Sequence, residues 1–168
     1  TRNRREDSER SYTFHGRDVY AYTGARLAAE QITFAEVGPR LDPKIVALPY
    51  EKPSGDASGV RGAIPVLDFR YGNVWTNIPG ALFSALNPKP EFGDRFHVVI
   101  THDTKEIWRG VLPYARTFGD VPEGEPLLYL NSLLNVALAL NMGDFAAKHG
   151  IGSGSGWAVQ ITPAASKL

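Results

Sequence analysis

Ala63-Ile-Pro-Val-Leu-Asp-Phe-Arg-Tyr-Gly-Asn-Val-Trp-Thr-Asn-Ile78 joins two apolar runs of strand length through an acid, a glycine and an amide. We expect strands over 62–69 and 73–78, with a ligand-facing bend between them. Asp68 emerges where the first run ends, and Asn73 opens the second. A carboxylate accepts hydrogen bonds from an ammonium or a hydroxyl group, and an Asn amide both donates and accepts, so this pair suits a small polar organic ligand.

Short apolar runs separated by turn residues follow this segment, which is typical of a mostly antiparallel β domain. His102-Asp-Thr104 predicts the tight turn of a β-hairpin. Short helices are expected over 80–86 and 144–149, the second with an Asp acceptor at its start and Gly150 past its end. Further strands are expected over 94–101, 105–112, 126–131, 134–140 and 156–161.

The N-terminal part of the chain has a different pattern. Residues 1–10 carry no apolar side chain and predict an exposed tail or loop. A helix is expected over 18–30, with Asp18 as its cap. A proline-rich stretch and then Ser54-Gly-Asp-Ala-Ser-Gly59 indicate a linker over 41–60 that begins rigid and ends flexible. The sequence therefore places a domain boundary within this linker.

Composition narrows the functional classes. At 168 residues, 43% of them hydrophobic, the chain can bury a core without staples. Its 18 basic and 18 acidic side chains cancel, so no charge field favours nucleic acid or an anionic membrane as a partner. Cysteine is absent, which excludes disulfides, thiolate catalysis and cysteine-based zinc sites. No apolar run approaches the roughly 20 residues that span a bilayer, and we expect a cytoplasmic location, with an upstream signal removed by processing left open.

Thr13-Phe-His-Gly-Arg-Asp18 is the first candidate for chemistry. Gly16 lets the backbone bend, and Asp18 leads into a helix whose N-terminus offers free N–H donors. That setting would let His15 hold a water molecule or an anion. The alternative, an interior histidine whose ring nitrogens form hydrogen bonds with the backbone, is about as frequent. The other three histidines lack such a setting.

Further positions are candidates for ligand contacts. Asp68 follows an apolar run, where it either binds a ligand or stabilises the turn before Gly72. Phe118 lies in a loop bracketed by Gly and Pro, and is equally well interpreted as a platform for a planar ring or as a plug for one end of the β domain. Strand ends collect binding groups, which draws attention to Asn131-Ser132 and Asn141-Met-Gly143.

The sequence contains no nucleotide-binding glycine loop, HExxH, GxSxG or carboxylate cage for a metal. Gly152-Ser-Gly-Ser-Gly156 is interpreted as a flexible turn, because no Lys follows it and it leads into a strand. We therefore expect neither a metal nor a cofactor.

Five separated segments, with Asn141 after them, agree in order and spacing with one known family. They are Thr13-Phe-His-Gly-Arg-Asp18, Glu36-Val-Gly38, Asp68 to Ile78, Thr117-Phe118 and Tyr129-Leu-Asn-Ser132. The chain resembles the S-adenosylmethionine (SAM) hydroxide adenosyltransferases and, more distantly, their halogenating relatives, the fluorinase and chlorinase. The resemblance covers residues 11–162.

This resemblance implies an α+β protein. Residues 1–40 would be the end of an α/β N-terminal domain that is largely absent here, 41–60 a linker, and 61–168 a C-terminal, mostly antiparallel, barrel-like β domain. In the family the ligand lies between the N-terminal domain of one subunit and the C-terminal domain of its neighbour, within a trimer. We therefore expect a homotrimer, or a separate chain that carries the N-terminal domain, with SAM as substrate.

Residue roles follow from the resemblance position by position. Asp68 would meet the methionine amino group, and Ser132 the methionine carboxylate. Asn73 and the backbone near Met142 would read the adenine edge, and Phe118 would stack on the adenine. The rest of the expected substrate-binding set is Tyr71, Asn141 and Gly16.

His15 matches the histidine that, in the hydrolytic members, helps an acid and an arginine orient the attacking water. Halogenating relatives tend to have another residue there and a serine where this chain has Gly16, so the pair favours hydrolysis. In-line attack on the electrophilic 5′ carbon of the sulfonium would give adenosine and methionine. Leu133 and Leu140 replace arginines of the fluorinase near the carboxylate pocket, which argues against halogenase-like binding of that end.

Three functions stay open at this point. The leading interpretation is an adenosine-forming SAM hydrolase that requires the missing N-terminal domain. The alternatives are a non-catalytic β module that binds an adenine-containing ligand or serves in assembly, and a SAM-dependent halogenase. The chain is accordingly a fragment, a cleavage product or one of two polypeptides.

Overall fold

The computed structural model describes residues 2–10, 13–46 and 50–164. The chain divides into two compact units, Thr1–Ala47 and Leu48–Leu168, and this division falls within the range expected for the linker. Within the three described ranges, no helix combines the length and the apolar character that a membrane-spanning segment needs.

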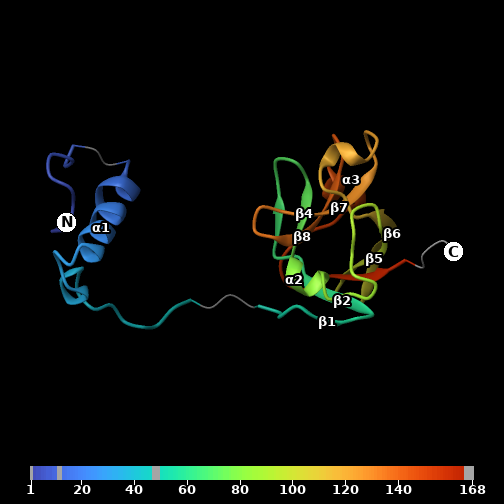
Figure 1. Cartoon of the computed structure of the whole chain (residues 1–168), viewed down its shortest axis with the longest axis horizontal. Helices are drawn as coiled ribbons and strands as arrows, with labels where there is room; N and C mark the ends of the chain where they lie inside the picture. Colours follow the sequence, from blue (N-terminus) through green and yellow to red (C-terminus); the bar gives the residue numbers. More distant parts are fainter. Residues whose placement is uncertain (1, 11–12, 47–49, 165–168) are drawn as a thin grey trace. The chain divides into compact units, whose positions relative to one another are not determined.

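The second unit consists of two antiparallel sheets (Figure 1). The first has five strands in the order β1 (Ser54–Asp56), β2 (Gly59–Ala63), β9 (Trp157–Pro163), β5 (Arg95–His102) and β6 (Lys105–Pro113). The second has four, in the order β3 (Val66–Asp68), β4 (Asn73–Pro79), β8 (Asn135–Leu140) and β7 (Pro126–Leu130). The shorter elements are α2 (Gly80–Phe83), the 3-10 turn η3 (Phe118–Asp120) and α3 (Phe145–His149). The expected α+β class and antiparallel β unit are confirmed, but the described strands form two sheets and not a closed barrel.

The prediction of a single strand over 62–69 is wrong. Pro65 has no N–H to donate to a neighbouring strand, and the chain breaks there into β2 of one sheet and β3 of the other. At this crossing the Ile64 N–H donates to the Trp157 carbonyl at 3.0 Å, and the Gly154 N–H donates to the Ile64 carbonyl at 2.9 Å. The other expected strands agree with β4 to β9, and the two expected helices with α2, which is shorter than expected, and α3.

The flexible end expected for the linker over 41–60 is also wrong. It forms β1 and the start of β2, which pair with Asp56 opposite Gly59. Asp56 Oδ1 accepts from the Ser58 N–H at 2.7 Å and from the Ser58 hydroxyl at 2.6 Å. The small polar residues of this stretch therefore supply a hairpin turn instead of a free connector.

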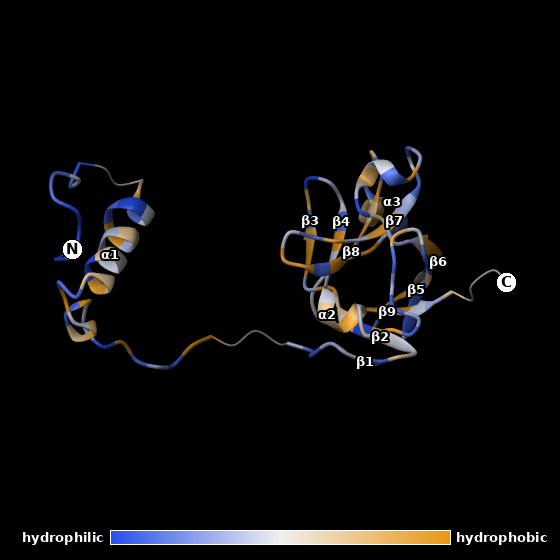
Figure 2. Cartoon of the chain, viewed as in Figure 1, coloured by the Kyte–Doolittle hydropathy of each residue, from blue (hydrophilic) through white to orange (hydrophobic). Residues whose placement is uncertain are grey.

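One hydrophobic core joins the two sheets of the second unit. Apolar residues run along the strands of both sheets (Figure 2). The Phe83 ring lies 5.0 Å from Phe96 and 5.1 Å from Tyr114. Burial of an aromatic or aliphatic side chain of this size contributes about 1.5–3 kcal/mol, so the core holds the sheets firmly. Its fully buried side chains include Phe83, Phe96, Ile100, Leu112, Leu138, Phe145 and Ile161.

The first unit contains a helix with an irregular start. Its elements are the π-helical segment η1 (Gly16–Ala21), α1 (Tyr22–Ala28) and the 3-10 turn η2 (Phe34–Glu36). The helix thus begins and ends earlier than the one expected over 18–30. Asp18 lies inside it, fully buried, and Arg17 donates to both carboxylate oxygens at 2.7 and 2.9 Å. The expected cap is therefore wrong, because the guanidinium already occupies the carboxylate.

The described residues of the N-terminal tail are not exposed throughout, contrary to expectation. Asn3 is buried, and its Nδ2 donates to the carbonyls of Glu36 at 3.0 Å and Val37 at 2.9 Å. The Arg5 N–H donates to the Asp18 carbonyl at 2.8 Å. Hydrogen bonds to backbone carbonyls therefore order a segment that has no apolar residue, which composition alone does not reveal.

Candidate small-molecule binding site

The face of the four-stranded sheet that lies away from the core carries polar and aromatic residues. Trp75 on β4 pairs with Ala137 on β8, and Ala137 pairs with Tyr129 on β7, so the three side chains lie on one face. Asp68 pairs with Asn73, and Asn73 lies two residues from Trp75, which places this pair on the same face. The alternation of the strands therefore separates a recognition face from the core face.

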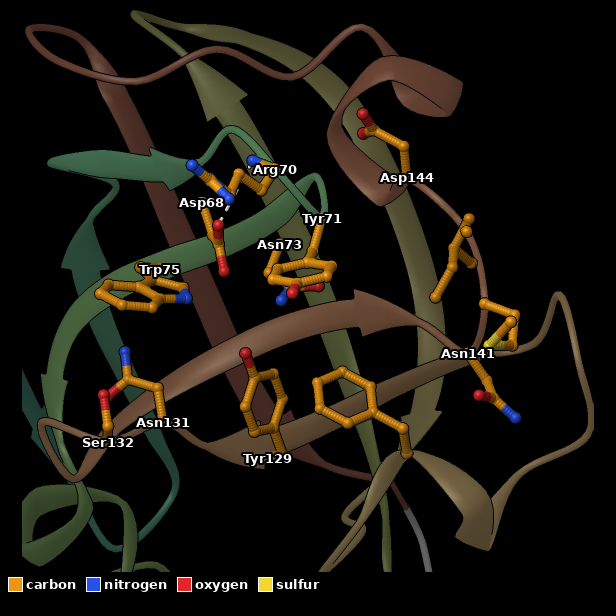
Figure 3. A pocket seen from close by; sticks show the side chains of 14 residues that line it. Asp68, Arg70, Tyr71, Asn73, Trp75, Tyr129, Asn131, Ser132, Asn141 and Asp144 are labelled. Atoms are coloured by element: carbon orange, nitrogen blue, oxygen red, sulfur yellow. Dashed lines mark hydrogen bonds between the residues drawn. The ribbon is translucent and has the colours of Figure 1, made fainter.

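A cavity of about 720 Å³ lies against this face (Figure 3). Its volume is in the range of cavities that bind small organic ligands. The structure brings together in its lining seven of the nine residues expected to act on substrate. They are Asp68, Tyr71, Asn73, Phe118, Ser132, Asn141 and Met142.

The bend between β3 and β4 holds Asp68 at the cavity. The Asp68 carbonyl accepts from the Tyr71 N–H at 3.1 Å and from the Gly72 N–H at 2.7 Å. Among the described residues, its carboxylate accepts one long hydrogen bond, from the Arg70 N–H at 3.4 Å. Because the backbone closes the turn, the carboxylate is available to a cationic ligand group, which weakens the interpretation of Asp68 as a turn residue alone.

Gly72 joins this bend to α3. Its φ of +66° is a conformation that side chains rarely adopt, and a Cβ here would overlap the Asp144 side chain. The Gly72 carbonyl accepts from the Ala146 N–H at 2.9 Å. Asp144 Oδ1 accepts from the Ala147 N–H at 2.7 Å, and Gly150 ends the helix with φ of 64°, so both expected caps of α3 are confirmed.

A capping box positions Phe118. Thr117 donates through its N–H to Asp120 Oδ2 at 3.0 Å and through its hydroxyl to Oδ1 at 3.1 Å. The hydrogen bond from the Thr117 backbone is the largest of the effects that lower the pKa of Asp120, so the capping box favours the ionised carboxylate. The Phe118 ring lies 5.0 Å from the Tyr129 ring and is 40% exposed. Such exposure suits a stacking platform better than a buried plug.

The segment between β8 and α3 forms another wall. Met142 has a left-handed backbone, with φ of 57°, and is 81% exposed. Asn141 lines the cavity, but its Nδ2 donates to the Val121 carbonyl at 2.8 Å. Figure 3 shows the Asn141 amide directed away from the Tyr129 ring. Asn141 therefore shapes the wall more than it offers free donors to a ligand.

Two buried donors in the lining, Trp75 Nε1 and Asn131 Nδ2, have no partner among the described residues. Asn131 is 5% exposed, and its Oδ1 accepts from the backbone N–H groups of Leu133 at 2.9 Å and Asn135 at 3.1 Å. A buried donor without an acceptor costs about 1–3 kcal/mol. Both positions therefore suit an acceptor supplied by a ligand.

Trp75 and Tyr129 are candidates that reasoning from the sequence misses as site residues, although each lies in a segment that it singles out. Asn131 is noticed there as a polar residue at a strand end, but it is not given a role toward the substrate. The two-residue period of a strand places Trp75 on the face of Asn73, which is a usable signal. That this face meets a cavity depends on the pairing of β4 with β8 and of β8 with β7, which the sequence does not display.

The cavity lining combines the charged side chains of Asp68, Arg70 and Asp144 with neutral donors. Burial raises the pKa of the Tyr129 hydroxyl. The Trp75 indole lowers this pKa, although its N–H does not form a hydrogen bond with the hydroxyl. The charge of Asp68 raises it further. The hydroxyl therefore stays protonated at neutral pH and can donate. Within the described ranges, no three histidine or carboxylate side chains are grouped as a metal site would need.

His15 and Gly16 belong to the first unit and are absent from the described cavity lining. His15 is exposed at the start of the helix. The Arg17 and Asp18 N–H groups donate to the Phe14 carbonyl at 3.1 and 2.9 Å, so the free N–H donors expected beside His15 are not available at these two positions. The hydrogen bond from Arg17 holds the pKa of Asp18 below its usual value, which leaves an exposed imidazole followed in the sequence by a closed ion pair.

A two-sheet β unit with an open, polar and aromatic cavity on the outer face of one sheet is typical of a small-molecule-binding domain. Residues 62–158 match the family model of the SAM hydroxide adenosyltransferase C-terminal domain. The chain belongs to this family, as the order of its motifs predicts.

The relatives carry two kinds of name. The (R)-S-adenosyl-L-methionine hydrolase of Salinispora tropica is 34% identical over 145 residues, which are 86% of this chain and 49% of that protein. A fluorinase of Actinoplanes sp. is 33% identical over 147 residues, 84% of this chain and 46% of the relative. The crystal structure of an uncharacterized conserved protein from Thermotoga maritima is 32% identical with a TM-score of 0.62, and the match covers 90% of this chain and 53% of that one. This chain thus spans about half the length of the relatives that it matches.

Proposed function

We propose that this chain supplies the substrate-binding half of an enzyme that hydrolyses SAM to adenosine and L-methionine. The observation that carries the proposal is the grouping of Asp68, Asn73 and Phe118 around one cavity in a member of this family. A carboxylate, an amide and an exposed ring are the groups that an ammonium, the adenine edge and the adenine face require.

The adenine end is assigned to Phe118, Asn73 and Met142. The exposed part of the Phe118 ring offers a stacking face. The Asn73 side chain is 4% exposed and makes no hydrogen bond with another described residue, so its donor and acceptor are both open to the cavity. Adenine presents donors and acceptors side by side on its edge, which such an amide matches. The left-handed backbone at Met142 adds peptide groups to the same wall.

The methionine end is assigned to Asp68 and Ser132. The Asp68 carboxylate accepts from the methionine ammonium in a charge-assisted hydrogen bond. Ser132 is exposed at the β7–β8 turn, where its hydroxyl reaches the outer side of the carboxylate. Tyr71, exposed in the bend after Asp68, covers the substrate from the solvent side.

Little covalent chemistry is left for the protein once SAM is bound. The oxygen of a water molecule attacks the 5′ carbon in line as the bond from that carbon to sulfur breaks. The bonding electron pair goes to sulfur, which leaves as the neutral thioether of methionine, and the proton of the water passes to a base. Alignment and desolvation of the water therefore supply much of the rate increase.

His15 is assigned to this water. It orients the water together with an acid and an arginine that this chain does not supply. The N-terminal half of a longer polypeptide, or of a second chain in a trimer, completes the site. The relatives' length supports this division, because the match covers 49% of the Salinispora tropica hydrolase.

A halogenase is the second candidate, because a fluorinase matches at 33% identity and a hydrolase at 34%. In that reaction a halide replaces water as the nucleophile at the 5′ carbon. The His15-Gly16 pair and the apolar side chains of Leu133 and Leu140 favour hydrolysis.

The test incubates SAM in halide-free buffer with this chain alone and with this chain joined to the N-terminal half of the Salinispora tropica hydrolase. Chromatography then measures adenosine and methionine. We expect equal amounts of both products from the completed protein, and binding without turnover from the chain alone. Binding of adenosine without products from the completed protein would support a non-catalytic module, and a 5′-halogenated adenosine formed with added chloride or fluoride would support the halogenase.

A further inference from the structure

The β7–β8 turn fixes the orientation of the Asn131 amide. Its Oδ1 accepts from the backbone N–H groups of Leu133 and Asn135. A reversed amide would place Nδ2 against these two donors, so the oxygen must face the turn. Nδ2 consequently points away from the turn, buried in the cavity lining without a partner among the described residues.

Trp75 presents a second such donor at the same end of the cavity. Trp75 and Tyr129 flank the short side chain of Ala137 across the sheet. Asn131 follows Tyr129 by two residues, directly after the end of β7, and both line the cavity. Figure 3 shows Trp75, Asn131 and Tyr129 on adjoining sides of the cavity, with Asp68 on the next side.

We propose that Asn131 Nδ2 and Trp75 Nε1 donate to the α-carboxylate of the methionine moiety, an inference that rests on the proposed function. Asp68 accepts from the ammonium on the same α-carbon. The amino acid end of SAM is then held as a zwitterion between one acid and two neutral donors, with Ser132 at the exposed side.

Carboxylate chemistry fits this pair better than adenine does. Two neighbouring donors match two acceptor oxygens, whereas the adenine edge needs a donor and an acceptor together. Leu133 and Leu140 bring no positive charge to the end of the cavity at Asn131 and Trp75. The positively charged residue Arg70 lies in the bend beside Asp68 (Figure 3). Neutral buried donors that already lack partners lower the cost of burying a carboxylate.

The consequence is selectivity for the intact amino acid end. The decarboxylated analogue of SAM keeps the adenosine, the sulfonium and the amine but presents no oxygen to these donors. Adenosine alone does not reach them. Both compounds would bind without engaging Asn131 or Trp75.

Nuclear magnetic resonance of the ¹⁵N-labelled chain tests the inference directly. The chain has three tryptophans, so three indole N–H signals are expected. The variant Trp75→Phe identifies the Trp75 signal. SAM should shift that indole signal and one Asn side-chain N–H pair, while the signals of Trp108 and Trp157 stay in place. The decarboxylated analogue should leave the Trp75 indole signal at its free position.

Calorimetry with matched variants gives the second measurement. Asn131→Asp keeps an oxygen for the turn and replaces the donor, and Trp75→Phe keeps a ring without the N–H. We expect each variant to bind SAM about 10- to 100-fold more weakly and adenosine as before. Asn131→Asp should keep or gain affinity for the decarboxylated analogue. Gln160→Glu, an exposed position on β9, makes the same charge change outside the cavity lining and should leave SAM binding unchanged.

The possible outcomes separate the role of Asn131 and Trp75 from the proposed function. SAM binding that is equal in Asn131→Asp and in the unsubstituted chain overturns the inference and leaves the proposed function intact. An equal loss for SAM and for the decarboxylated analogue in Trp75→Phe also overturns it, because the indole would then act through packing. Failure of the unsubstituted chain to bind either SAM or adenosine overturns the proposed function itself. If a variant does not fold, the comparison of SAM with its analogue on the unsubstituted chain still gives the answer.

Discussion

The Ala146 N–H donates to the Gly72 carbonyl at 2.9 Å, so the first turn of α3 is joined to the bend between β3 and β4. Asp68 and Asn73 flank this bend, and Met142 precedes the helix. The junction therefore connects the wall assigned to the methionine ammonium with the wall assigned to the adenine edge.

Gly72→Ala is expected to destabilise the second unit. The new Cβ meets the Asp144 side chain, and the φ of +66° adds backbone strain, so the free energy of unfolding should fall by about 3–4 kcal/mol. Gly150→Ala is the matched control, because its φ is +64° and a Cβ there meets nothing within 4 Å. It should cost about 1–2 kcal/mol. Urea unfolding measures both, and equal losses would contradict the assigned overlap.

Phe118→Ala is expected to weaken adenosine binding by about 1–3 kcal/mol, the usual contribution of a stacked base. Phe92→Ala is the control, since Phe92 is also an exposed aromatic but stacks on Tyr114, outside the cavity lining. Calorimetry on both folded variants provides the comparison. If the dissociation constant for adenosine is unchanged in Phe118→Ala, Phe118 has a structural role and does not stack on the adenine.

Asp68→Asn is expected to weaken SAM binding by about 1.5–3 kcal/mol while adenosine binding stays the same, because adenosine has no ammonium group. The amide keeps an oxygen for the Arg70 N–H, so the bend should hold. Asp103→Asn removes one charge at the exposed β5–β6 turn and should change neither affinity. Equal weakening of SAM and adenosine would show that Asp68 supports the fold of the site.

His149 should make the stability of the second unit depend on pH. Burial lowers the pKa of His149, and the charge of Lys148 lowers it further. The folded state then binds this proton less readily than the unfolded chain, whose histidine titrates near pH 6.5. The contribution is therefore fully present above about pH 6.5 and is lost as the pH falls from there toward the lower folded-state pKa. Thermal unfolding between about pH 8 and about pH 5 should show this decline.

His149→Phe should flatten that pH profile. The new ring can keep the contacts that the imidazole makes with Trp108, at 5.4 Å, and with Phe145, at 4.7 Å, but it takes up no proton. His97→Gln, on the exposed side of β5, serves as the control and should leave the slope as in the unsubstituted chain. A slope that persists in His149→Phe assigns the pH dependence to other groups.

The sequence predicts well those elements whose ends are marked by local chemistry. The hairpin at His102-Asp-Thr104 is bounded by two apolar runs, and β5 and β6 pair there with His102 opposite Lys105. The helix α3 has an acceptor before it and a glycine after it. Such signals need no knowledge of distant partners, and both elements are confirmed.

Features that depend on one specific partner, even one close in the sequence, are predicted poorly. β1 contains Ser54-Gly-Asp56 without an apolar residue, and it is a strand because β2 is beside it. Asp18 fits the pattern of a cap, but Arg17 occupies its carboxylate. Asn131 Nδ2 can be recognised as a donor without a partner only from the structure, because the backbone of the β7–β8 turn donates to the Asn131 oxygen.

The crossing of the chain at Pro65 also determines when each sheet can form during synthesis. Residues 66–140 contain all strands of the four-stranded sheet, whereas β2 must wait for β9, since Val60 pairs with Ile161. Such distant pairing closes a large loop before it gains contacts, which slows folding. A nascent chain that pauses before Trp157 would have β2 and the β5–β6 hairpin without the strand β9 that joins them. The apolar face of its four-stranded sheet would then be only partly covered, and at that stage it would be open to aggregation or to a chaperone.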